Sequence, residues 1–132
     1  MSNLVTIGEL SLNTGVPTKT IRYYEETGLI PKAQRRPNGY RVYGERATHL
    51  LRFIKHARDL GFSVHDVGEL LALWNNKKRK SENVKRLAEA HLQSIDQKIS
   101  ELQELRQTLT HLVNCCQGDE RPDCPILEGL AG

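Results

Sequence analysis

Three cysteines lie near the end of the 132-residue chain, and their spacing is suited to chemistry at sulfur. Cys115 and Cys116 are adjacent, and the short, mainly polar segment 117–123 separates Cys116 from Cys124. A segment of this length can fold back and bring the sulfurs together. Thiolates bind soft metal ions and also oxidise, so the spacing predicts either a metal site or a redox pair.

Composition limits where this chemistry takes place. Only 38% of the residues are apolar. No apolar run reaches the roughly 18 residues of a membrane span, and residues 1–5 lack the pattern of a secretory signal. We therefore expect a cytoplasmic protein without a membrane partner. Thiols stay reduced in that compartment, which favours metal or redox chemistry over a structural disulfide.

Charge is divided unevenly along the chain. Residues 1–80 contain 14 Lys and Arg against 7 Asp and Glu, whereas residues 81–132 contain 5 against 9. A basic half of this kind favours binding to a polyanion such as nucleic acid, although an ordinary solvated surface would show the same imbalance.

The start of the basic half has the pattern of a helix-turn-helix. Thr6 and Glu9 form a capping box, which predicts a short helix that ends in a turn at Gly15. A second helix is expected to begin near Pro17 and to end at Gly28. In a helix-turn-helix this second helix enters the major groove of DNA.

Spacing on the second helix separates an inward face from an outward one. Ile21 and Tyr24 lie three residues apart and are expected to pack inward. The adjoining face presents cations and a phenol that suit phosphates, although any amphipathic surface helix could show this pattern. Its residues are Lys19, Arg22, Tyr23 and Glu26.

A basic hairpin is predicted directly after these helices. Asn38 and Gly39 both accept positive φ, and they lie between short segments of strand-forming residues. The hairpin is too small to need a core of basic and aromatic residues, yet it contains Arg35, Arg36, Tyr40 and Arg41. Beside a helix-turn-helix, such a hairpin is a wing suited to the DNA backbone or minor groove.

Two further helices are expected to cover the first two. One apolar stripe consists of Ala47, Leu50, Ile54 and Ala57 with Phe53 beside it, and a second, after a cap at Ser63, consists of Val67, Leu70, Leu71 and Trp74. We predict that Trp74 lies in the core. No thiol is placed to complete a metal site here, so three histidines are interpreted as surface or packing residues: His49, His56 and His65.

A long helix is predicted over residues 81–114, after a polar hinge at 76–80 that ends the DNA-binding region 1–75. Ser81 is a suitable N-cap for it. Apolar residues then recur every three or four positions from Val84 to Leu112, along roughly 45 Å of helix. A domain this small cannot bury such a stripe, so a second copy of the chain is expected to cover it in a coiled coil.

The tail, residues 115–132, is expected to form a loop and then a short helix over Pro125–Leu130. Proline is favoured in the first turn of a helix. The helix would begin just after Cys124, where its amides and dipole can lower the pKa of that thiol.

Together these motifs resemble the MerR family of bacterial transcriptional regulators. The resemblance is carried by TIRYYE at 20–25, GLI at 28–30, NGYRVY at 38–43 and RDLGFS at 58–63, and it covers essentially the whole chain. It implies a mainly α fold with a winged helix-turn-helix domain, a long antiparallel coiled-coil dimerisation helix and a C-terminal metal-binding loop. It also implies a homodimer that binds promoter DNA and works with RNA polymerase.

The tail 116–127 is similar to the copper-efflux-regulator branch of that family, which responds to Cu(I), Ag(I) and Au(I). The similarity implies that Cys116 and Cys124 are the metal ligands. Soft thiolates suit Cu(I), which accepts two ligands, whereas zinc normally takes four. Related regulators of divalent ions carry a cysteine where this chain has the neutral Ser81. Cys115 departs from the copper pattern and matches the zinc-responsive branch, so a response to zinc or cadmium stays an alternative.

The resemblance also implies how such a dimer works. It binds its promoter with and without metal, and the metal repositions the DNA-binding domains so that the DNA is bent and undertwisted until polymerase can engage it. The DNA contacts that we expect are Lys19, Arg22, Tyr23, Arg35, Tyr40, Arg41 and Arg58.

Other classes of function make different predictions. A thiol redox sensor would oxidise Cys116 with Cys124, or with Cys115, and peroxide alone would activate it. A metal-buffering protein would use the same loop and bind DNA without sequence preference. An enzyme is not expected, because no nucleophile, base and orienting group converge in the sequence.

Overall fold

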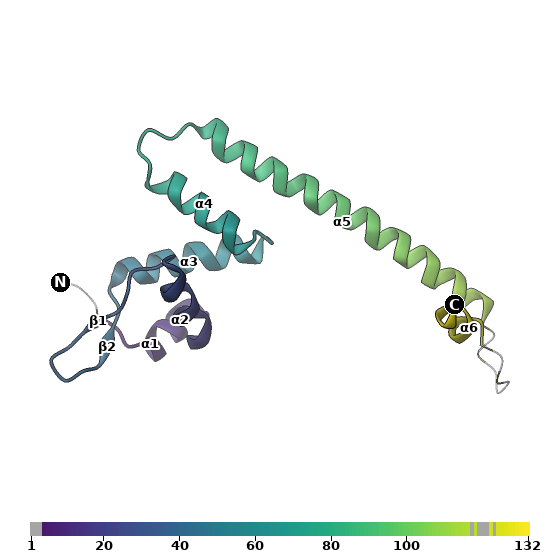
Figure 1. The fold of residues 1–132 in the computed structure, drawn as a ribbon, viewed down its shortest axis with the longest axis horizontal. Coiled ribbons are helices and arrows are strands. Elements are labelled where there is room, and N and C mark those ends of the chain that lie inside the picture. Colours follow the sequence, from purple (N-terminus) through teal and green to yellow (C-terminus); the bar gives the residue numbers. More distant parts are fainter. Residues whose placement is uncertain (1–3, 117, 119–121, 123) are drawn as a thin grey trace. The chain divides into compact units, whose positions relative to one another are not determined.

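The computed structural model describes residues 4–116, 118, 122 and 124–132, and it divides into two compact units at Lys80 and Ser81 (Figure 1). The basic unit contains α1 (Ile7–Thr14), α2 (Thr18–Thr27), β1 (Gln34–Arg35), β2 (Arg41–Val42), α3 (Glu45–Asp59) and α4 (Val64–Asn75). The second unit contains α5 (Ser81–Cys115) and α6 (Pro125–Ala131). The predicted fold class is therefore confirmed: mainly helical, with a small antiparallel hairpin and a long helix near the C-terminus. Within the described residues, no helix combines the length and the apolar content needed to cross a bilayer.

The residues that begin and end the first helices act as the sequence predicts. The Thr6 hydroxyl accepts a hydrogen bond from the Glu9 amide at 3.2 Å, and the Glu9 carboxylate accepts one from the Thr6 amide. Gly15 ends α1 with a φ of 76°, a left-handed conformation that favours glycine. Pro17 precedes the first residue of α2, and Gly28 ends that helix. These local signals produce the helix-turn-helix of α1 and α2.

The core of the basic unit lies among α1 to α4 and the wing, which is the β1–β2 hairpin. Ile21 is fully buried and Tyr24 is 6% exposed, which confirms the inward face of α2. The outward residues Lys19, Arg22, Tyr23 and Glu26 are exposed. Burying one large apolar side chain contributes about 1.5–3 kcal/mol. The side chains buried most completely are Leu10, Ile21, Ile30, Val42, Leu51, Ile54 and Val67.

The turn of the wing differs from the prediction at Asn38. Among the described residues only glycines have positive φ; Gly39 does, at 88°, whereas Asn38 does not. The Asn38 side chain instead accepts a hydrogen bond from the Tyr40 amide at 3.1 Å, and the Gly39 amide donates to the carbonyl of Arg36 at 2.8 Å. Pro37 suits the second position of this turn. The loop is thus longer than the tight Asn-Gly turn that the sequence predicts.

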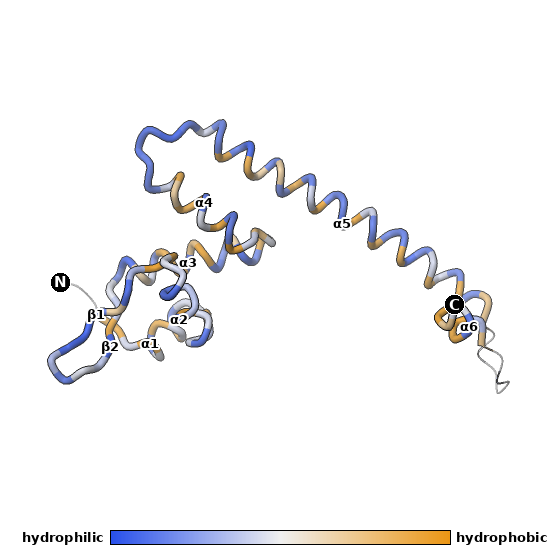
Figure 2. The backbone as a smooth tube through the Cα atoms, in the orientation of Figure 1, coloured by the Kyte–Doolittle hydropathy of each residue, from blue (hydrophilic) through white to orange (hydrophobic). Residues whose placement is uncertain are grey.

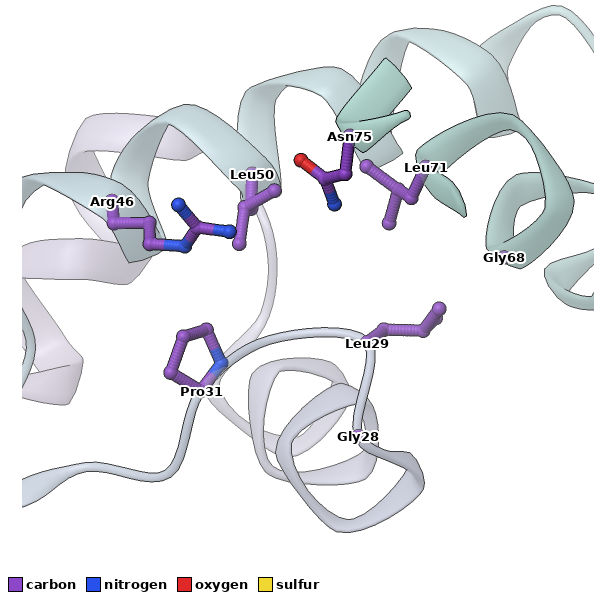
Figure 3. A pocket seen from close by; sticks show the side chains of 8 residues that line it. All are labelled: Gly28, Leu29, Pro31, Arg46, Leu50, Gly68, Leu71 and Asn75. Carbon is purple, nitrogen blue, oxygen red and sulfur yellow. The ribbon is translucent and has the colours of Figure 1, made fainter. Parts of the chain in front are cut away.

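The buried stripe of α3 also differs from the prediction. Leu51 is fully buried, whereas Leu50 is only half-buried. Leu50 lines a hollow of about 300 Å³, with Leu29 and Leu71 facing into it from the loop after α2 and from α4 (Figure 3). Stripes that contain Leu50 or Leu51 both have helical spacing, so only tertiary packing distinguishes them.

Trp74 does not lie in the core as predicted, because its side chain is 62% exposed. Its ring packs against Phe53, with the ring centroids 5.8 Å apart, and the guanidinium of Arg79 lies 5.7 Å from its centroid. Arg79 also donates a hydrogen bond to the Trp74 carbonyl at 3.2 Å. Trp74 therefore supports the end of α4 from the surface through ring stacking and a cation–π contact.

Apolar residues recur along the length of α5, as the colours of the tube in Figure 2 show. Among the described residues of α5, no side chain is buried. The side chains of Ile99, Leu102, Leu105 and Leu109 are 48–66% exposed. Helix α6 packs against α5, and a Cβ added at Gly129 would lie 2.9 Å from the Leu112 side chain. Glycine at this position therefore lets the two helices approach closely.

Candidate metal centre and nucleic-acid interface

Two thiols lie at the two ends of the connection between α5 and α6. Cys116 directly follows α5, and Cys124 occupies the N-cap position of α6. Both side chains are half-buried. Residues 117, 119–121 and 123 of the predicted metal-binding loop lie outside the described residues. The helix that the sequence predicts after Cys124 is present and begins at Pro125.

The start of α6 makes Cys124 more acidic than an ordinary thiol. The backbone amide of Leu127 lowers the pKa of Cys124 most, and the amide of Ile126 and the Cys116 side chain lower it further against an opposing effect of burial and of Glu128. These amides belong to the first turn of α6 and favour the charged form of the sulfur.

Two sulfur donors suit only some metal ions. Among the described residues, no group of three or more His, Cys, Asp and Glu side chains is placed to hold a metal ion. Zinc normally takes four ligands, whereas soft thiolates suit Cu(I). Two thiolates around a monovalent ion leave one net negative charge, and the start of α6 can stabilise it. Among the described residues, Cys116 and Cys124 therefore supply two sulfur donors, the ligand type that soft ions prefer.

Ser81 and Cys115 lie at opposite ends of α5. The helix has 35 residues, so these ends are separated by roughly 50 Å at 1.5 Å per residue. Ser81 cannot reach the thiols of its own chain, and any effect on them must come from a second chain. Cys115 is the last residue of α5 and is exposed, and its sulfur lies 3.8 Å from Nε2 of His111.

Three of the basic residues predicted to bind DNA lie together between α2 and the wing. A surface pocket of about 330 Å³ is lined by Arg22 on α2, by Arg35 and Arg41 on the wing, and by Lys32 between them. Glu25 and Glu26 also line it. Lys19, Tyr23 and Tyr40 lie outside this pocket lining but are exposed, with Tyr23 and Tyr40 at 50% and 68%.

Two arginines face each other across the wing. Arg35 lies directly opposite Arg41 in the antiparallel register, so both side chains project from the same face, and both are exposed. Like charges directly opposite each other destabilise a hairpin. A phosphate placed between them would relieve this repulsion, and the pair is therefore suited to a nucleic-acid backbone.

Hydrogen bonds to Glu25 tie the wing to α2. The Tyr43 hydroxyl donates to Oε2 at 2.7 Å, and the Ala33 amide donates to Oε1 at 2.8 Å. Burial opposes ionisation of Glu25, but these donors, with Arg41 and Lys32, outweigh it and lower the pKa of the carboxyl. Burial and then Glu25 raise the pKa of Tyr43 to about 12. The hydroxyl therefore stays a donor at neutral pH.

Arg58 is partly engaged within its own loop. Its Nη1 donates to the carbonyl of Phe62 at 2.7 Å and so secures the connection between α3 and α4. A guanidinium has five donor hydrogens, which leaves others available to a phosphate. Arg58 lies at the end of α3 and is absent from the pocket lining that contains Arg22, Arg35 and Arg41.

Comparison with known proteins identifies the family. The model of MerR HTH family regulatory proteins matches residues 5–74, and the model described as MerR, DNA binding matches residues 48–112. The chain belongs to the MerR family. It is therefore a transcriptional regulator and not an enzyme.

Individual MerR-family proteins resemble the chain over almost its whole length. It is 50% identical over 127 residues to heavy metal-dependent transcription regulator 2 of Rhizobium meliloti, covering 96% of this chain and 86% of that relative. It is 41% identical over 128 residues to CueR of Escherichia coli, covering 97% and 95%. The structure of PbrR691 from Ralstonia metallidurans in complex with lead(II) is similar, with a TM-score of 0.80, 29% identity and coverage of 96% and 98%.

Three residues at or beside the predicted DNA-contact surface were absent from the sequence prediction. Lys32 lines the basic pocket, and its positive charge next to the predicted wing could have identified it from the sequence as a DNA-contact candidate. Glu25 and Tyr43 position the wing, but they lie 18 residues apart and no spacing rule connects them.

The Glu25 contacts predict an acid-sensitive attachment of the wing. The pKa of Glu25 is lower in the folded chain, so its contribution is fully present above the ordinary pKa and is lost as the pH falls through the folded value. We expect Glu25→Gln to lower the free energy of unfolding by about 1 kcal/mol at pH 7, after allowing for solvent screening. The difference from wild type should shrink below about pH 4.

Urea unfolding of the full chain at several pH values, at fixed protein concentration, measures this effect. Glu26→Gln is the matched control, because it removes a neighbouring carboxylate of α2 but neither hydrogen bond to Glu25. A difference between wild type and Glu25→Gln that stays constant down to pH 3 would contradict the prediction.

Proposed function

We propose that this MerR-family regulator binds promoter DNA as a homodimer and activates transcription of metal-detoxification genes when Cys116 and Cys124 bind Cu(I). Ag(I) and Au(I) present the same charge and softness and are expected to act alike. The observation that carries the proposal is the position of the two thiols: Cys116 directly follows α5 and Cys124 caps α6, and these two helices pack against each other. Metal efflux genes are the natural targets of a regulator with such an effector.

Charge supports a monovalent ion. Two thiolates and Cu(I) leave one net negative charge, and the amides of Leu127 and Ile126 offset part of it. A divalent ion would need further donors, and Ser81, the residue expected to approach from the partner chain, is neutral. Relatives at 41–50% identity include CueR and a heavy metal-dependent regulator, which agrees with a metal effector.

The exposed row on α5 supports a homodimer. Ile99, Leu102, Leu105 and Leu109 lie on successive turns and leave about half or more of their surface exposed. A second copy offers an equally long apolar row, so pairing two α5 helices as a coiled coil would cover both. Pairing in opposite directions would also bring Ser81 of one chain toward the thiols of the other.

The metal would act by joining two elements. Cys116 ends α5 and Cys124 begins α6, so an ion held by both would fix α6 against the end of the dimerisation helix. The ion must favour one of two dimer states, because an equal affinity for both would shift nothing. In the favoured state the DNA-binding units would bend and undertwist the promoter so that RNA polymerase can engage it, with phosphate contacts offsetting a deformation of several kcal/mol.

A divalent response of the same fold is the second candidate. Cys115 supplies a further thiol beside Cys116, and the similar PbrR691 was crystallised with lead(II). The exposed position of Cys115 argues against this divalent alternative. Cys115 contacts His111, whereas Cys116 acts on Cys124, so Cys115 is not placed as a third ligand beside the other two thiols.

Exchange of Ser81 for cysteine tests the charge argument. We expect wild type to activate transcription in vitro with buffered Cu(I) or Ag(I) and to stay silent with zinc. Ser81→Cys should add a zinc response of at least about tenfold, because a third thiolate supplies both a ligand and a charge. Ser81→Thr is the matched control, since it preserves the neutral hydroxyl.

Three outcomes would overturn parts of this proposal. Zinc activation of wild type would establish the divalent alternative, and activation by peroxide without metal would establish a thiol redox sensor. Continued silence of Ser81→Cys toward zinc, with Cu(I) activation intact, would show that Ser81 does not set selectivity.

A further inference from the structure

The two adjacent cysteines have different neighbours. Cys116 is half-buried and acts on the sulfur of Cys124. Cys115 is exposed, and its sulfur lies 3.8 Å from Nε2 of His111. His111 precedes Cys115 by four residues on α5, so both side chains lie on one face of the helix, one turn apart. The vicinal pair therefore takes part in two separate arrangements.

The distance between Cys115 and His111 is close to what a shared metal ion requires. Metal bonds of about 2.3 Å to sulfur and about 2.0 Å to nitrogen place the two donors roughly 4.3 Å apart when they lie on opposite sides of the ion. The observed 3.8 Å needs an increase of only about 0.5 Å, which small side-chain rotations supply. Both residues belong to a regular helix, so the backbone already holds them in position.

The donor types also match a monovalent soft ion. Thiolate sulfur is the preferred ligand of Cu(I), and imidazole is a good ligand for copper. One thiolate, one neutral imidazole and one monovalent cation carry no net charge together. Such a site can form at an exposed helix end without a buried counter-charge, unlike the pair Cys116 and Cys124.

We propose that Cys115 and His111 form a second binding site for a monovalent soft cation on each chain, separate from the site at Cys116 and Cys124. The second site is neutral and open to solvent, so it binds its ion more weakly and exchanges it faster than the first. It does not depend on the proposed regulatory role, because its donors come from one helix of one chain.

Counting bound Ag(I) tests the proposal. The reduced full-length protein is dialysed without oxygen against buffered Ag(I), and bound silver is measured by mass spectrometry. Wild type should bind two ions per chain, and Cys115→Ser should bind one. The double variant Cys116→Ser with Cys124→Ser should also bind one. His111→Ala should lose most of the weaker ion, whereas the matched control His65→Ala, another exposed helical histidine, should retain both.

A second measurement identifies the ligand atom directly. In the Cys116→Ser, Cys124→Ser variant, Ag(I) should shift the imidazole ¹⁵N resonance of His111 Nε2, and Cys115→Ser should abolish that shift. One ion per chain in wild type, a second ion that persists in Cys115→Ser, or an unchanged His111 resonance would overturn the proposal. Loss of both ions in the Cys116→Ser, Cys124→Ser variant would show that Cys115 and His111 do not bind alone. If Cys116→Ser loses Cu(I) activation while the second ion remains, the two proposals stand separately.

Discussion

Cys124→Ser is expected to abolish activation by Cu(I) while leaving promoter binding largely intact. Cu(I) held by two thiolates loses one of its two ligands, and the serine hydroxyl is a hard, neutral replacement. Removing a residue that only hydrogen-bonds to a metal ligand costs roughly 10- to 100-fold in affinity, so removing a ligand itself should cost more than about 100-fold. Cys116→Ser should behave in the same way, because the proposed link between α5 and α6 needs both sulfurs.

In vitro transcription with buffered Cu(I), combined with a mobility-shift assay on the same promoter, measures both effects. Cys115→Ser is the matched control, since it removes the neighbouring thiol and should retain activation. A Cu(I) response that survives in Cys116→Ser or Cys124→Ser would show that the ligand assignment is wrong. X-ray absorption at the copper edge should report sulfur ligands in wild type and fewer of them in either variant.

The second large effect is expected on DNA affinity, when arginines of the wing are replaced. Arg41→Ala should weaken promoter binding severalfold at low salt, and the double change Arg35→Ala with Arg41→Ala should weaken it further. Each lost phosphate contact should reduce the slope of log K against log salt by about 0.9, because fewer counterions are released. The loss should be similar on specific and unrelated DNA, since phosphate contacts carry no sequence information.

Fluorescence anisotropy titrations at several salt concentrations give both quantities. Arg106→Ala is the matched control, because it removes an exposed arginine of α5 rather than of the basic unit. Relief of the repulsion between Arg35 and Arg41 should slightly stabilise the free hairpin of Arg41→Ala. A salt slope identical to that of wild type would remove the wing from the DNA interface.

The sequence predicted the elements that local chemistry determines. Thr6 with Glu9, Gly15 and Gly28 begin and end the first helices through hydrogen bonds and left-handed φ values that nearby residues alone decide. Proline after Cys124 marked the start of α6 for the same reason. The apolar row of α5 was visible because it repeats over many turns.

Packing decided what the sequence could not. Leu50 and Leu51 both fit the helical spacing of the apolar stripe of α3. Leu51 is the one that is fully buried, and packing against the neighbouring elements decides this. Trp74 was predicted as core from its spacing, but Phe53 and Arg79 hold its ring at the surface. Asn38 takes negative φ because its side chain finds the Tyr40 amide. The split between Cys115 and Cys116 was also invisible, since adjacent residues give no sign of which way each sulfur turns.

The clamp that Glu25 makes between Ala33 and Tyr43 has a consequence for how an effector can reach DNA. Its two hydrogen bonds join α2 to the residues that flank the wing, so a motion of α2 against the wing would have to break them. An allosteric signal that moved α2 against the wing would therefore act against these two hydrogen bonds. We therefore expect an effector to displace α2 and the wing together, through a movement that begins elsewhere in the protein.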